Sequence, residues 1–144
     1  MEIVNNKQIW KGFFNYQEDF EDIEQYIEVT FTMELNFNED SFIGTTTDSE
    51  SENIFDKPAT VKGFIDRNKM SFVINYPCLY YKDENGKIVL DKKTKHPEIR
   101  YLGYYDEDYK VISGTWEMTL YEEKNLEDYL EAFAEGQFQM RRVQ

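Results

Sequence analysis

The stretch Val29-Thr30-Phe31-Thr32-Met33-Glu34-Leu35-Asn36-Phe37 places apolar residues at every odd position and polar residues at every even one. Successive side chains of a β-strand point to opposite faces, so this stretch predicts a strand with one face in a core and the other in solvent. Similar alternation predicts seven more strands, near residues 9–16, 41–47, 59–66, 70–76, 99–105, 109–120 and 137–143. Most connections are short and polar, which favours antiparallel pairing of successive strands.

Glycine recurs on the apolar side of these predicted strands, two residues from a large apolar side chain in each case (Gly12, Gly44, Gly63, Gly103 and Gly114). Strand interiors usually avoid glycine, so the pattern indicates a strongly bent sheet or room left for facing aromatic rings. We therefore predict an all-β fold, an eight-stranded antiparallel up-and-down barrel. A two-sheet sandwich is the alternative that short alternating strands also allow.

Two segments depart from the meander. Residues 77–97 form an insertion whose Asn85-Gly86 is a strong signal for a tight turn, so we expect a projecting hairpin there. Residues 125–136 place four apolar side chains on one helical face (Leu126, Tyr129, Leu130 and Phe133). With Asn125 as N-cap and Gly136 as terminator, they predict one short helix before the last strand.

Length, charge and cysteine content narrow the class of protein. The 144 residues suit a single domain, residues 1–144, with enough chain to bury a core. A net charge of −13 disfavours nucleic acid and anionic membranes as partners and would attract a basic protein. Cys78 is the only cysteine, so it forms no internal disulfide, and we expect it to be unreactive. The sequence shows no targeting or membrane-spanning segment, from which we expect a cytoplasmic protein.

The residues offer no recognisable catalytic set. His96 is the only histidine and lies in the basic stretch 92–97, where we expect it to be solvated. A catalytic triad or a closed zinc site would need that histidine, and neither a phosphate loop nor a dinucleotide fingerprint is present. We therefore expect no catalytic residues, no metal site, no cofactor and no enzymatic activity.

Several segments together resemble the lipocalin-like and avidin-like barrels, the calycins. They are the eight-strand meander, Trp10-Lys11-Gly12, the segments 101–105 and 112–116, and the closing segment 136–142. The resemblance implies an eight-stranded barrel that binds a small molecule. The last strand carries Gln137 and Gln139 where avidin-like proteins use an aspartate, so biotin is not the expected ligand.

An eight-stranded barrel either fills its interior with side chains or holds about one small ligand. The predicted inward face is mostly apolar, so a ligand would be a small hydrophobic molecule oriented by a few polar groups. The candidate ligand-binding residues are Trp10, Tyr16, Tyr76, Tyr101, Tyr105, Trp116 and Arg142. Core packing is the alternative role for the aromatic members of this set. Arg142 either stacks on Trp10 to close one barrel end or is a solvated charge.

The sequence thus favours a non-enzymatic, lipocalin-like binding protein, monomeric or homodimeric. The alternative is an acidic immunity- or inhibitor-type protein that binds a basic protein partner through residues 48–52 and 122–135. Tyr80, Tyr81 and Ile88 of the inserted hairpin are expected to be exposed, either as a dimer patch or as surface of the hairpin.

Overall fold

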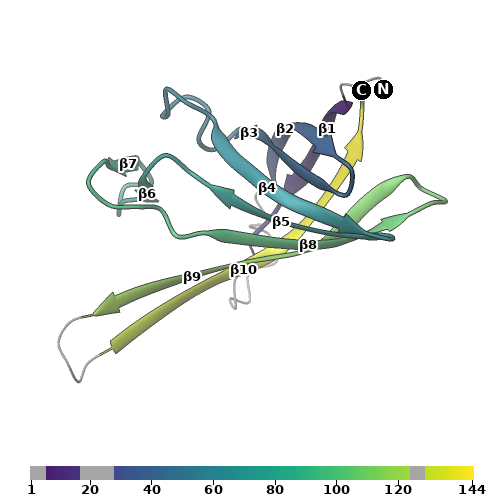
Figure 1. Ribbon diagram of the computed structural model, residues 1–144. Helices are drawn as coiled ribbons and strands as arrows, with labels where there is room; N and C mark the ends of the chain where they lie inside the picture. The colour runs from purple at the N-terminus through teal and green to yellow at the C-terminus, as the bar shows by residue number, and fades with distance from the viewer. Residues whose placement is uncertain (1–5, 17–27, 124–128) are drawn as a thin grey trace.

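The computed structural model describes residues 6–16, 28–123 and 129–144 (Figure 1). Ten strands make up its regular structure within these ranges. They are β1 (Asn6–Phe14), β2 (Val29–Asn38), β3 (Ser41–Asp48), β4 (Ala59–Asp66), β5 (Lys69–Asn75), β6 (Leu79–Lys82), β7 (Ile88–Asp91), β8 (Ile99–Asp106), β9 (Val111–Glu123) and β10 (Tyr129–Arg142). No helix among the described residues is long and apolar enough to cross a membrane.

Eight of the strands close into a barrel in the order β1-β10-β9-β8-β5-β4-β3-β2, with antiparallel pairing at every step. The predicted up-and-down barrel is confirmed, and the sandwich alternative is wrong. The chain leaves the barrel between β5 and β8 to form the β6–β7 hairpin, as predicted for the insertion. Its turn holds Gly86 at a φ of 76° and is fixed by the Asp83 carboxylate, which accepts from the backbone N–H groups of Asn85 and Lys87 at 2.9 Å.

The predicted helix is wrong: its described part, from Tyr129 onwards, belongs to strand β10, while residues 124–128 lie outside the described residues. Strand β9 continues to Glu123 and pairs with β10 from Tyr129, so ladder hydrogen bonds replace helical ones. The sequence also carries the strand pattern here, because the even positions from Leu130 to Met140 are apolar or glycine throughout. The two strands extend together beyond the other barrel strands in Figure 1.

Nearly all residues predicted to face inward are buried, and the three exceptions, Ile65, Tyr105 and Met118, pack partly buried against the core. The Tyr101 ring stacks on Phe72 with centroids 4.8 Å apart and meets Phe138 at 4.9 Å. With the fully buried residues around them, these rings occupy the middle of the barrel. Any ligand space inside the barrel therefore lies toward its ends.

Glycine makes this packing possible, as predicted. A Cβ at Gly103 would lie 2.7 Å from Ile112 Cγ2 and 2.8 Å from the Phe138 ring, closer than real carbon contacts allow. A Cβ at Gly63 would lie 2.8 Å from the Phe42 ring. The absent side chains thus leave room for aromatic rings from facing or neighbouring strands.

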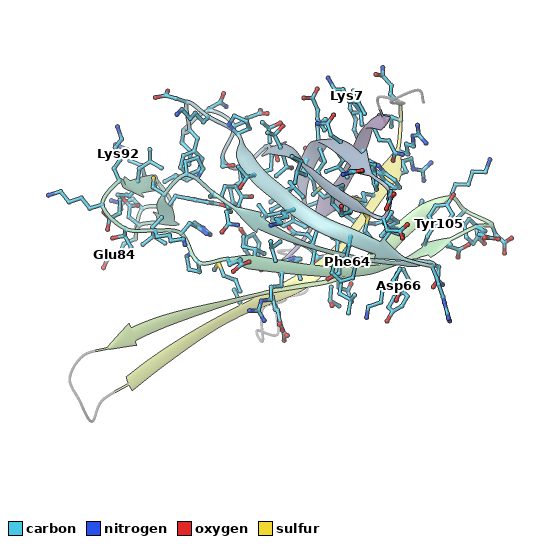
Figure 2. All side chains as sticks on the ribbon, in the orientation of Figure 1. Lys7, Phe64, Asp66, Glu84, Lys92 and Tyr105 are labelled. Carbon is cyan, nitrogen blue, oxygen red and sulfur yellow. The ribbon has the colours of Figure 1, made fainter. Side chains whose placement is uncertain are left out.

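The two ends of the barrel differ in construction. One end, here called the hairpin end, carries the β2–β3, β4–β5 and β8–β9 turns. The other, here called the tyrosine end, carries the β3–β4 connection and the segment that includes β6 and β7. Figure 2 shows Asp66 and Tyr105 at the hairpin end and Glu84 and Lys92 at the opposite end.

Candidate functional site

The predicted ligand-binding residues divide between the two barrel ends. Four of them line a small cavity at the tyrosine end (Tyr16, Tyr76, Tyr101 and Trp116). The other three line a much larger pocket at the hairpin end (Trp10, Tyr105 and Arg142). Alternation along strands correctly predicts which side chains face inward, but it does not tell which end of the barrel each one reaches.

Two carboxylates organise the tyrosine end. Asp48, the last residue of β3, is buried and accepts from the backbone N–H of Ser51 at 2.7 Å, from its hydroxyl at 2.8 Å, and from the Tyr76 hydroxyl. Glu50 accepts from the hydroxyls of Tyr16 at 2.8 Å and Tyr80 at 3.1 Å. These carboxylates therefore bind phenols of the same chain, which argues against residues 48–52 as a solvated face for a basic partner.

The network keeps its tyrosines in the neutral form. Burial raises the pKa of Tyr16, Tyr76, Tyr80 and Tyr101 well above the usual value of 10, and the nearby carboxylates add to the rise. A phenolate beside Asp48 and Glu50 would place like charges together in a poorly solvated site. The phenols thus act as hydrogen-bond donors, and none is set up as a base.

His96 and Tyr80 correct two sequence predictions. His96 is 5% exposed, not solvated: its ring stacks on Tyr80 at 5.2 Å and packs on Tyr76 at 5.0 Å. Its Nδ1 donates to the carbonyl oxygen of Pro97 at 2.8 Å, and burial lowers its pKa from 6.5, so the ring is neutral. Tyr80 is half-buried in this cluster instead of forming an outer patch. The side chain of Tyr81 lies outside the described residues.

Trp116 completes the aromatic wall of the tyrosine end. Its Nε1 donates to the carbonyl oxygen of Asn15 at 2.9 Å, and its ring meets Tyr16 edge-on at 5.3 Å. The cavity between these rings measures about 70 Å³. That volume suits a few water molecules, far below the roughly 300–1,000 Å³ of typical small-molecule sites.

The hairpin-end pocket measures about 620 Å³, within the range of small-molecule sites. Its floor is formed by the buried side chains of Trp10, Met70 and Ile112. Ile65 and Tyr105 are half-buried and line it from β4 and β8. An apolar floor with partly exposed apolar walls can bury the body of a ligand.

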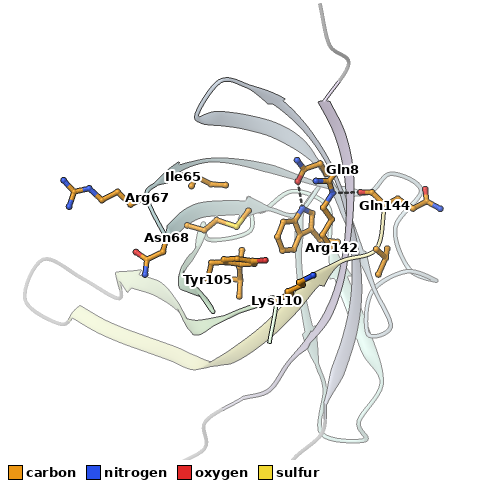
Figure 3. Close-up of a pocket in the computed structure, with 12 residues that line it drawn as sticks. Gln8, Ile65, Arg67, Asn68, Tyr105, Lys110, Arg142 and Gln144 are labelled. Carbon is orange, nitrogen blue, oxygen red and sulfur yellow. Dashed lines mark hydrogen bonds between the residues drawn. The ribbon is translucent and has the colours of Figure 1, made fainter. Parts of the chain in front are cut away.

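The rim of this pocket is polar. It includes Gln8, Arg67, Asn68, Lys110, Arg142 and Gln144. The Trp10 indole N–H donates to Gln8 Oε1 at 3.0 Å, and Arg142 Nε donates to the Gln144 carbonyl oxygen at 2.9 Å (Figure 3). Arg142 is the ladder partner of Trp10 between β1 and β10, and its stacking on the Trp10 ring stays a prediction. Arg142 is an exposed residue on this rim.

Backbone contacts hold the turns that flank the pocket. The Ile65 N–H donates to the Asp40 carbonyl oxygen and the Tyr105 N–H to the Asn68 carbonyl oxygen, both at 2.7 Å. These bonds tie β4 to the β2–β3 turn and β8 to the β4–β5 turn. The pocket is therefore preformed by the barrel strands and their short connections.

No metal site is evident in the part of the chain that the structure describes, because no three of its His, Cys, Asp and Glu side chains are grouped to hold an ion. Cys78 is buried. Asp48 and Tyr80 at the tyrosine end and Gln8 and Lys110 at the hairpin end were not among the predicted site residues. The signal for Asp48 was present, since Phe42, Gly44, Thr46 and Asp48 share the inward parity of β3.

The closed meander of eight antiparallel strands, open to a pocket at one end, defines a calycin-type barrel. The structure of this chain is similar to a solved avidin-like structure, the crystal structure of rhizavidin. The two share 10% sequence identity over 96% of this chain and 84% of that one, with a TM-score of 0.50. No family model and no curated protein matches the sequence. At this identity the likeness establishes the fold alone.

Proposed function

We propose that the protein is a non-enzymatic binding protein that holds a small molecule in the hairpin-end pocket. The observation that carries the proposal is the pocket itself, about 620 Å³ over a floor of Trp10, Met70 and Ile112. The tyrosine end offers about 70 Å³, and its carboxylates already accept from tyrosines of the chain. The avidin-like fold supports a binding role because barrels of this size commonly carry one small ligand.

The two tryptophans allow a direct test, since Trp10 lines the hairpin-end pocket and Trp116 lines the tyrosine-end cavity. In Trp116→Phe, emission reports on Trp10 alone, and in Trp10→Phe it reports on Trp116 alone. Fatty acids, sterols, tetrapyrroles and flavins would first be screened for a rise in the melting temperature, because a ligand that binds the native state stabilises it.

A compound that raises the melting temperature is expected to change the Trp10 emission in Trp116→Phe and to leave the Trp116 emission in Trp10→Phe unchanged. Native mass spectrometry of the protein from its own host would then look for a molecule of matching class. Stabilising compounds that change only the Trp116 emission would overturn the choice of pocket. A protein with no bound molecule and no stabilising compound would overturn the binding role.

A further inference from the structure

The lining of the hairpin-end pocket departs from the charge of the chain. Asp and Glu outnumber Lys and Arg by 29 to 16 over the sequence. Among the described residues, the pocket lining nevertheless includes three cationic residues, Arg67, Lys110 and Arg142, and no Asp or Glu. A local excess of positive charge in a strongly acidic protein needs an explanation of its own.

Two of these cations face the pocket together. Figure 3 shows Arg142 beside Gln8 and Gln144, with Lys110 and Tyr105 next along the rim, whereas the Arg67 guanidinium points away from the other labelled side chains. Within the described residues, the one ion pair closer than 4 Å is Lys7–Glu34, so neither Lys110 nor Arg142 forms an ion pair with a described Asp or Glu. Both side chains are exposed and can reach a ligand.

Gln8 and Arg142 both keep hydrogen-bond donors that bind no described acceptor. Gln8 Oε1 already accepts from Trp10, which leaves its amide nitrogen as the free end of that side chain. Arg142 uses Nε for the Gln144 carbonyl oxygen, and its two terminal nitrogens have no acceptor among the described residues. Asp106, at the start of the β8–β9 turn, is engaged in that turn because its Oδ1 accepts from the N–H groups of Asp108 and Tyr109.

Lys110 also has an uncommon backbone conformation. The described residues other than glycine with positive φ are Glu39 at 58°, Arg67 at 61° and Lys110 at 57°. Each belongs to a turn at the hairpin end, and glycine or asparagine would adopt this conformation at lower cost. At Lys110 the costly conformation coincides with a pocket cation that has no carboxylate partner in the described chain.

We propose that the hairpin-end pocket selects a small organic anion, whose apolar body lies over Trp10 and whose carboxylate binds Arg142 and Lys110. This inference rests on the proposed function, because it names the ligand class of the same pocket. An arginine guanidinium can bind a carboxylate through two parallel hydrogen bonds, and a lysine adds a compact charge beside it. The Gln8 amide supplies a further donor on the same side of the rim.

Three probes with one apolar body separate the ligand classes: naphthalene-2-carboxylate, its neutral carboxamide and naphthalen-2-ylmethylammonium. Binding would be measured on Trp116→Phe through Trp10 emission and on the unmodified chain by calorimetry. We expect the carboxylate to bind at least tenfold more tightly than the carboxamide, and the ammonium probe to bind most weakly. Equal binding of the carboxylate and the carboxamide, or tighter binding of the ammonium probe, would overturn the anion preference and leave the pocket as a ligand site. Failure of all three would count against the proposed function as well.

Variants then assign the preference to the two cations. Lys110→Gly removes the charge and relieves the positive φ, so it should fold at least as well as the parent and bind the carboxylate about tenfold more weakly. Arg142→Gln should lose at least as much affinity. Two control variants lie outside the pocket lining. Glu39→Gly relieves the same backbone conformation, and Lys62→Gln removes an exposed positive charge from β4. Both variants should bind the carboxylate as the parent does. Unchanged carboxylate affinity in Lys110→Gly and Arg142→Gln would refute the assignment.

Discussion

The buried tyrosines predict a steep loss of stability at high pH. In the folded state, burial holds the pKa of Tyr16, Tyr76, Tyr80 and Tyr101 above the range in which the unfolded chain titrates. Above pH 10 the unfolded state therefore releases protons that the folded state keeps. Because the unfolded state then binds fewer protons than the folded state, the free energy of unfolding falls as the pH rises. Below pH 10 this contribution is fully present.

The size of the effect follows from the number of tyrosines. Each group that stays protonated only in the folded state lowers the free energy of unfolding by about 1.4 kcal/mol per pH unit above 10. The four tyrosines together give a slope of about 5 kcal/mol per pH unit. A domain with about 5–15 kcal/mol of stability should then unfold between about pH 11 and 13.

Urea titrations at several pH values, followed by circular dichroism, give this slope, and absorbance near 295 nm follows tyrosinate formation. Tyr101→Phe removes one of the four phenols and should lower the slope by about 1.4 kcal/mol per pH unit. Tyr104→Phe is the matched control, because that ring is 52% exposed on the outer face of β8. If all tyrosines titrated near pH 10 while the β-sheet signal stayed native, the account of the tyrosine end would be refuted.

Three further predictions concern other parts of the barrel. Gly103→Ala should lower the free energy of unfolding by about 1–3 kcal/mol, measured by urea titration, because the new Cβ would meet Ile112 and Phe138; a change below about 0.5 kcal/mol would contradict the packing. Burial lowers the pKa of His96 from 6.5, so stability should fall as the pH drops below 6.5 and the unfolded chain takes up the proton, and His96→Phe should lose that dependence. A pKa of about 6.5 for His96 in the folded protein, measured by NMR, would contradict this prediction. Amides at 119–123 and 129–133 should exchange hydrogen faster than those of β2 and β3, because no other described strand pairs with this part of the β9–β10 pair; equal protection would contradict that.

Local alternation was enough to predict the barrel, since strand parity and short turns fix both which residues face inward and which strands are neighbours. Inward residues such as Phe31, Met33 and Leu35 follow from their own strand alone. The wrongly predicted helix shows that local periodicity alone does not always decide between a helix and a strand. The stretch from Tyr129 to Gly136 fits both periodicities, and the choice depends on β9, which continues far enough to pair with it.

The sites depend on contacts between distant segments, which a single sequence does not show. Tyr76 meets Asp48 across 28 positions, and Trp116 meets Asn15 across 101. His96 was predicted to be solvated because its neighbours in the chain are basic, yet the rings that bury it come from residues 76 and 80. Composition near a residue in the chain is a poor guide when its partners come from other strands and loops.

The net charge of the chain is a poor guide to the charge of the pocket for the same reason. A total of −13 describes the field that a ligand meets at long range, and at physiological salt that field decays over about 8 Å. The charged side chains that line the hairpin-end pocket among the described residues are Arg67, Lys110 and Arg142, while Asp48 and Glu50 bind tyrosines at the opposite end. The two sites thus differ in charge, because Asp48 and Glu50 accept from tyrosines in one, whereas Lys110 and Arg142 line the other without an ion pair to a described Asp or Glu. An acidic protein can therefore present a cationic pocket, and the sign of its ligand follows from the groups that line that pocket and not from their sum over the chain.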